Sequence, residues 1–182
     1  RMLQRIVRIG IPVGMQSVMY NISNVIIQAG VNTLGTDNVT AWATYGKVDG
    51  LYWMMINALG ISATTFVGQN FGAGRLDRVR KGAGACMVIG VVLTASVGVV
   101  LYNGGHLLVE LFTTDQQVQA ISMDLLHFMV PTFITYIAIE ILSGTLRGVG
   151  DAWMPLIITG IGVCAVRVLW IMFVLPHYHT II

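Results

Sequence analysis

Three charged residues lie inside otherwise apolar stretches of the sequence, where few side chains can do polar chemistry. Lys47 and Asp49 fall within residues 39–67, and Arg167 falls within residues 154–175. Lys47 and Asp49 are two positions apart, so on a helix they point to nearly opposite sides and cannot form the usual pair at a spacing of three or four. Each of these charges therefore needs a partner elsewhere, or water in a cavity.

Asp49 and Arg167 stand at comparable depths in their two stretches, so the sequence predicts that they pair. Two interpretations of this pair stay open. It is either a structural ion pair that fixes the register of two helices, or part of a polar patch that lines a cavity for a cationic or polar substrate or a coupling ion.

Uncharged polar residues mark one face of the first apolar stretch. Asn21, Asn24 and Gln28 recur at helical spacing, and Gln16 stands one to two turns before them. Such a stripe either forms hydrogen bonds between helices or lines a hydrated pocket. Both readings remain open at this stage.

Motifs for other kinds of chemistry are missing from the sequence. It contains no H-E-x-x-H, no C-x-x-C and no Walker sequence, and its four histidines are spread along the chain. No Ser, Thr or Cys nucleophile is accompanied by a residue that could act as its general base. We therefore expect neither an enzyme nor a bound metal centre.

The composition defines the setting of these residues. Of 182 residues, 55% are hydrophobic and only 10% are charged, and the mean hydropathy is +0.77. Soluble domains carry about 25% charged residues, so this chain could not cover a water-exposed surface. The sequence predicts an integral membrane protein, and its 21 glycines favour close helix packing.

A helix needs about 20 predominantly apolar residues to cross a bilayer, and five segments of the chain qualify. We therefore predict an all-α, polytopic fold with about five transmembrane helices, at residues 9–31, 39–67, 83–102, 121–145 and 154–175. Pro131 falls inside the fourth span and is expected to kink it there, as a hinge candidate. Glu140 lies near the end of the same span, where it is either solvated or part of the polar patch.

Lys and Arg are distributed on one side only of the predicted spans. Cytoplasmic loops are enriched in these residues, so we expect a cytoplasmic N-terminus and a C-terminal end outside. The basic residues of the three presumed cytoplasmic flanks are Arg1, Arg5 and Arg8, then Arg75, Arg78, Arg80 and Lys81, and finally Arg147.

Four segments closely resemble the C-terminal half of bacterial multidrug and toxic compound extrusion (MATE) transporters. They read IGIPVGMQ (9–16), VNTLGTDNVTAWATYGKVDG (31–50), TTFVGQNFGAGRLDRVRKG (64–82) and LSGTLRGVGD (142–151). The motif F-V-G-Q-N-x-G-A-G with its following basic run, and L-R-G-x-G-D, are specific when they occur together in this order. The resemblance covers nearly the whole chain.

The resemblance implies a particular architecture. MATE transporters have two lobes of six helices each, so residues 1–182 would form most of the C-terminal lobe, with helices seven to eleven present and the last helix missing. The missing N-terminal lobe would be a partner of this chain. The setting implied is the bacterial cytoplasmic membrane.

The resemblance also implies an activity, namely export of organic cations and amphipathic drugs by alternating access. Na⁺ or H⁺ would be the coupling ion, with no other cofactor and no nucleic acid as partner. Two alternatives remain, a lipid-oligosaccharide flippase of the same superfamily and a non-transporting membrane scaffold subunit.

The family pattern places Lys47 and Asp49, in G-K-V-D-G, as cavity candidates. Some sodium-coupled relatives bear carboxylates on their seventh and tenth helices, whereas the first span here has no acid and the fourth has Tyr136 with Glu140 one turn away. In proton-coupled relatives the key carboxylate belongs to the first lobe. The full set of substrate or ion cavity candidates is Gln16, Asn21, Asn24, Lys47, Asp49, Tyr136, Glu140 and Arg167.

Overall fold

The chain folds into helices joined by short connections. Its structure is a computed structural model that describes residues 2–165 and residue 169. No strand occurs among these residues, as the all-α prediction requires. The elements are α1 (Met2–Val31), η1 (Asn32–Leu34), α2 (Thr36–Gly72), α3 (Leu76–Glu110), α4 (Gln116–Met129), η2 (Val130–Thr132), α5 (Phe133–Gly148), α6 (Trp153–Thr159) and η3 (Gly160–Ala165).

Local sequence signals end one helix and start the next. Gly74, with φ at +71°, ends the turn between α2 and α3 in the left-handed region that glycine adopts without strain. Asp115 caps α4 by accepting a hydrogen bond from the backbone N–H of Gln117 at 2.9 Å. Asp151 does the same for α6, accepting from the N–H of Trp153 at 3.1 Å.

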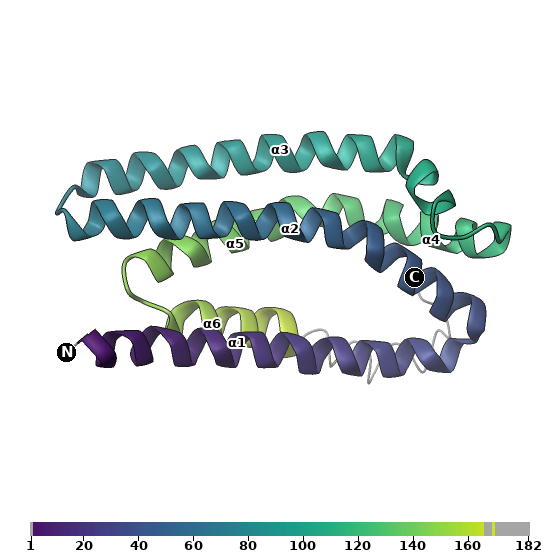
Figure 1. Cartoon of the computed structure of the whole chain (residues 1–182), viewed down its shortest axis with the longest axis horizontal. Helices are drawn as coiled ribbons and strands as arrows, with labels where there is room; N and C mark the ends of the chain where they lie inside the picture. The colour runs from purple at the N-terminus through teal and green to yellow at the C-terminus, as the bar shows by residue number, and fades with distance from the viewer. Residues whose placement is uncertain (1, 166–168, 170–182) are drawn as a thin grey trace.

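The helices form two groups (Figure 1). The helices α2 and α3 run antiparallel, and α4 and α5 pack against both of them, whereas α1 packs chiefly against α6 and η3. The buried core lies within the first group, where the largest fully buried side chains include Tyr52 and Ile56 of α2 and Ile137 and Ile141 of α5.

Three helical segments of the described chain are long and apolar enough to cross a membrane. They are residues Thr36–Gly72, Leu76–Glu110 and Gln116–Gly148, which correspond to the second, third and fourth predicted spans. The first predicted span lies in α1, a helix of 30 residues whose hydropathy is lowered by its Gln and Asn residues. The fifth begins at α6 and continues past the described residues.

The fourth predicted span is interrupted at Pro131, where the sequence predicts a kink. The helical path changes at η2, a 3₁₀ segment with Pro131 near its start, and then continues as α5. A proline has no N–H for the helical ladder, and its ring clashes with the preceding turn, which explains the break.

The basic flanks gather toward one end of the molecule. The start of α1, the α2–α3 connection and the α5–α6 connection all lie toward the same end in Figure 1. The connections without Lys or Arg, between α1 and α2 and between α3 and α4, lie toward the other end. Basic and non-basic connections are therefore separated at the two ends of the bundle.

Close contact between α2 and α5 depends on glycine. A Cβ atom placed on Gly144 would lie 2.6 Å from the carbonyl oxygen of Gly60, and one on Gly148 would lie 2.8 Å from the carbonyl oxygen of Thr64. These neighbours are backbone atoms, which cannot move without shifting a helix. Gly144 and Gly148 form a G-x-x-x-G motif, and both of its glycines face α2.

We predict that Gly144→Ala destabilises the protein by about 1–3 kcal/mol, the usual cost of forcing an extra methyl group into a closed contact. Thermal unfolding of the purified protein in detergent measures this loss. Gly84→Ala in α3 is the matched control, because a Cβ there meets nothing within 4 Å. Equal melting temperatures for the two variants would contradict the close approach of α2 and α5.

Candidate ligand cavity

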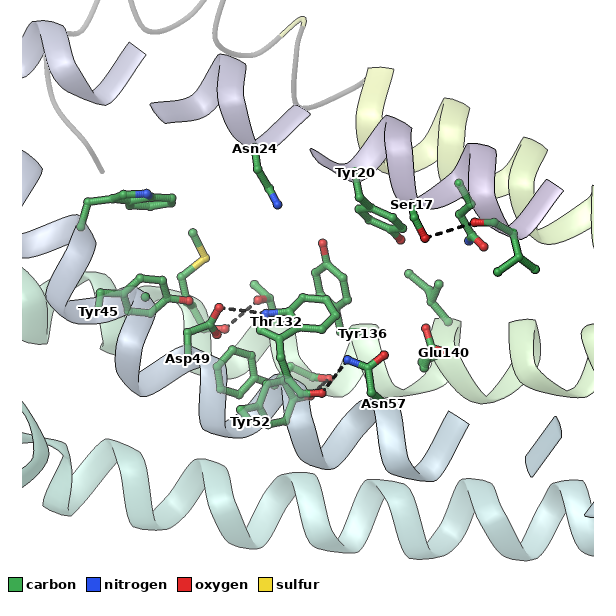
Figure 2. A pocket seen from close by; sticks show the side chains of 18 of the residues that line it. Ser17, Tyr20, Asn24, Tyr45, Asp49, Tyr52, Asn57, Thr132, Tyr136 and Glu140 are labelled. Carbon is green, nitrogen blue, oxygen red and sulfur yellow. Dashed lines mark hydrogen bonds between the residues drawn. The ribbon is translucent and has the colours of Figure 1, made fainter. Parts of the chain in front are cut away.

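A cavity of about 500 Å³ lies between the two groups of helices. Its walls come from α1, α2, the α4–η2 region and α5 (Figure 2). The lining residues are Val13, Gln16, Ser17, Tyr20, Asn24, Trp42, Tyr45, Gly46, Asp49, Tyr52, Trp53, Asn57, Met129, Thr132, Phe133, Tyr136, Ile139, Glu140 and Arg147. The size is that of pockets for small organic molecules.

Asp49 lies in the cavity wall and is held by a neighbouring indole. The Nε1 of Trp53, one turn further along α2, donates a hydrogen bond to Oδ2 of Asp49 at 2.8 Å. The Trp53 ring in turn meets the ring of Tyr136 edge-on, with centroids 4.9 Å apart. The carboxylate is therefore oriented by an aromatic pair that joins α2 to α5.

A second aromatic pair fixes the same two helices. The rings of Tyr52 and Phe133 stack with centroids 3.8 Å apart, and the Tyr52 hydroxyl donates to the Phe133 carbonyl at 2.7 Å. This carbonyl follows Pro131 closely, at the junction of η2 and α5, where the helical ladder is interrupted. The tyrosine hydroxyl therefore adds a hydrogen bond from α2 to the first residue of α5.

The opposite wall comes from α1, where Gln16 and Asn24 face the cavity. The Nε2 of Gln16 donates to Oγ1 of Thr159 at 2.8 Å, and Thr159 donates to the carbonyl oxygen of Pro155 at 2.6 Å. This buried chain of hydrogen bonds joins α1 to α6. Figure 2 shows Asn24 and Tyr20 pointing from α1 toward the side chains of α2 and α5.

The predicted polar stripe on α1 separates into two parts. Asn24 lines the cavity, as a hydrated pocket wall would require. Asn21 instead donates to the carbonyl oxygen of Ser17 on its own helix at 2.9 Å, and Gln28 donates to Asn32 at 2.9 Å. Asn21 is not among the cavity-lining residues, and the bonds of Asn21 and Gln28 do not cross between the spanning helices.

Lys47 lies outside the cavity, unlike Asp49. It is exposed, and its Nζ stands over the ring of Phe112, 4.9 Å from the centroid. Phe112 follows the end of α3, so the ammonium lies near one end of the bundle rather than in its middle. The two-residue spacing separated these charges as expected, and only the Asp49 side faces the pocket.

Glu140 lies in the cavity wall and is paired there. Its Oε1 lies 2.5 Å from Nη2 of Arg147, and the side chains are 22% and 18% exposed. Glu140 is therefore paired within the cavity wall and partly exposed. Arg147, which the sequence suggested only as a basic flank, turns back into the cavity, and its distance of seven residues from Glu140 was the signal for this pairing.

The remaining predicted site residues are placed as follows. Tyr136 lines the cavity beside Trp53, and Pro131 lies in η2, next to the lining residue Thr132. Arg167 lies outside the described residues, so its pairing with Asp49 stays a prediction. Within the described part of the chain, no group of three or more His, Cys, Asp or Glu side chains could hold a metal ion.

The fold and the cavity define a class, namely a multi-pass α-helical membrane protein with a ligand-sized cavity between its helices. The model of one protein family, MatE, matches residues 12–172. The chain therefore belongs to the MATE family, as its motifs suggested.

Named relatives agree with this assignment. Over 97% of its length the chain is 24% identical to "Probable multidrug resistance protein YoeA" of Bacillus subtilis. Over 96% of its length it is 25% identical to "Probable multidrug resistance protein NorM" of Thermotoga maritima. In both comparisons the chain spans 38% of the relative's length.

Solved structures share the fold. A MOP superfamily transporter from Pyrococcus furiosus matches 93% of this chain with a TM-score of 0.80 at 16% identity, and the match covers 42% of that transporter. An outward-facing MATE family transporter matches 97% of this chain with a TM-score of 0.80 at 15% identity, over 46% of its own length.

We predict that Thr159→Val lowers the stability of the protein by about 1 kcal/mol, because it leaves the buried Gln16 amide without its acceptor. For a chain of this size the melting temperature should fall by about 2–4 °C. The control is Thr65→Val, since the exposed Thr65 hydroxyl bonds only to the Ile61 carbonyl of its own helix. Equal losses in both variants would show that the α1–α6 bond contributes nothing of its own.

Proposed function

We propose that the chain forms most of the C-terminal lobe of a secondary active exporter of organic cations and amphipathic drugs. Family membership and the names of the relatives support a multidrug transporter. An N-terminal lobe of the kind that the family has would supply the opposite face of the transport path. One lobe alone would be inactive, because alternating access requires a site reached from two sides.

The observation that carries this proposal is the presence of Asp49 in a cavity lined by aromatic rings. A carboxylate attracts an organic cation through its charge. The faces of Trp, Tyr and Phe rings attract the same cation through their quadrupoles and bury its apolar body. Trp53 and Tyr136 combine both roles, because Trp53 orients the carboxylate while the two rings remain part of the wall.

The proposed mechanism is antiport driven by Na⁺ or H⁺ across the bacterial cytoplasmic membrane. We place the N-terminus in the cytoplasm and the end of the chain outside, because the basic flanks share one end of the bundle. The polar groups along the path come from Gln16, Asn24, Tyr136 and Glu140. Pro131, in η2 just before α5, is the proposed hinge.

A lipid-oligosaccharide flippase is the first alternative. Its phosphate-bearing substrate would require a strongly basic cavity. Among the described lining residues Arg147 is the only Lys or Arg, and its charge is matched by Glu140. Lys47 lies outside the cavity. A non-transporting scaffold subunit is the second alternative, and it gives no reason for the cavity.

We predict that Asp49→Asn abolishes drug export by the complete transporter and weakens binding of a monovalent organic cation at least about tenfold, since one charge interaction in a partly buried site is lost. Drug resistance of cells that lack other exporters measures transport, and membrane fractionation measures insertion, which should be unchanged. Dissipating the Na⁺ or the H⁺ gradient separately identifies the coupling ion.

Lys47→Gln is the matched control, because it removes a charge two residues away from Asp49 on the side that does not face the cavity. Resistance should remain close to that of the unmodified protein. Full resistance with Asp49→Asn, or equal losses in both variants, would contradict a role of Asp49 in the cavity.

A further inference from the structure

The ion pair between Glu140 and Arg147 lies in the wall of the cavity. Seven residues separate the two on α5, a rise of about 10 Å, and seven residues are nearly two full turns, so both side chains share one face of the helix. They extend along this face toward each other, and their charged atoms meet at 2.5 Å. About four fifths of each side chain is removed from solvent.

Gly60 of α2 has no side chain, and this leaves space for the Glu140 carboxylate. A Cβ on Gly60 of α2 would lie 2.6 Å from Oε1 of Glu140 and 2.9 Å from its Cγ. Any other residue at Gly60 would push the carboxylate out of its present position. Glu140 is therefore packed against α2, and the pair is less exposed than an ordinary surface salt bridge.

The pair also lies apart from Asp49. Figure 2 shows Glu140 and Asp49 toward opposite ends of the labelled group of side chains. Gly60, which contacts Glu140, is eleven residues beyond Asp49 on α2, or about 16 Å along the helix. A single organic cation at Asp49 does not reach both carboxylates with its charge.

A partly buried carboxylate in a cavity wall is a strong acceptor for any cation that enters. In this structure that position already holds the guanidinium of Arg147. The apparent affinity of a competing cation is then reduced by the fraction of molecules in which the pair is open.

We propose that Arg147 is a specificity-determining residue, whose guanidinium is a tethered cation that occupies the Glu140 carboxylate. A cationic ligand reaches this end of the cavity only by displacing the guanidinium. The inference rests on the proposed function, since it concerns which cations the same cavity accepts. In this proposal Arg147 has a role in the cavity, in addition to contributing a positive charge to the connection between α5 and α6.

A purely structural pair would behave differently from a tethered cation. If Arg147 only held α5 in place, its removal would lower stability and leave cation binding equal or weaker. If Arg147 competes with ligands, its removal tightens cation binding, and the gain depends on the Glu140 charge. The direction of the change in affinity separates the two roles.

The test uses tetraphenylphosphonium, a monovalent organic cation, with the complete purified transporter in lipid nanodiscs and isothermal titration calorimetry. For Arg147→Gln we expect a dissociation constant about fivefold lower than that of the unmodified protein. Arg147→Lys keeps a cation at the position, so its gain should be smaller. The double variant Arg147→Gln with Glu140→Gln should lose the gain.

Gly60→Ala provides a second approach that leaves both charges in the chain. The three atoms nearest to the added methyl group, Oε1, Cγ and Cδ, all belong to the Glu140 side chain rather than to backbone, so we expect the pair to separate while the fold is kept. Cation binding should tighten, as with Arg147→Gln. Gly50→Ala on the same helix is the control, because a Cβ there meets nothing within 4 Å.

The outcomes separate this inference from the proposed function. If the unmodified protein binds the cation and neither Arg147→Gln nor Gly60→Ala tightens this binding, the tethered cation is overturned. The exporter proposal then remains intact. Binding that appears only when Arg147 is removed supports the tethered cation and contradicts the Asp49 site. An absence of binding in every form overturns both.

Discussion

The close approach of α2 and α5 is the contact on which the rest of the structure depends. Gly144 and Gly148 bring the backbone of α5 against the carbonyl oxygens of Gly60 and Thr64. In a membrane the hydrophobic effect does not drive helices together, so such packing and polar contacts must do so. Because these two helices are fixed, the aromatic pairs Tyr52–Phe133 and Trp53–Tyr136 form.

The cavity follows from this arrangement and from the separate pairing of α1 with α6. Gln16 and Thr159 connect α1 to α6, while α1 makes few contacts with α2. The polar and aromatic side chains of α2 and α5 therefore face a space instead of a packed neighbour. Within the α2 wall, Oδ2 of Asp49 accepts a hydrogen bond from the Trp53 indole.

The charged residues of the chain differ in role because they differ in position on their helices. Lys47 reaches the end of the bundle beside Phe112, as long basic side chains commonly do near a membrane surface. Asp49 has no comparable reach and stays in the wall. Arg147 is long enough to extend back two turns to Glu140, so a residue of the basic end also contributes to the cavity.

The sequence alone determined the membrane class, the all-α fold and the family, because composition and local motifs are properties of the chain itself. It also pointed to Asp49, Gln16, Asn24 and Tyr136 as cavity candidates and to a kink at Pro131. It did not determine which side chains share a space. The exclusion of Lys47 and Asn21 from the cavity and the pairing of Glu140 with Arg147 depend on how helices rotate and approach. Contacts between helices remote in sequence, such as the one that Gly60 permits, decide this rotation, and only the tertiary structure contains them.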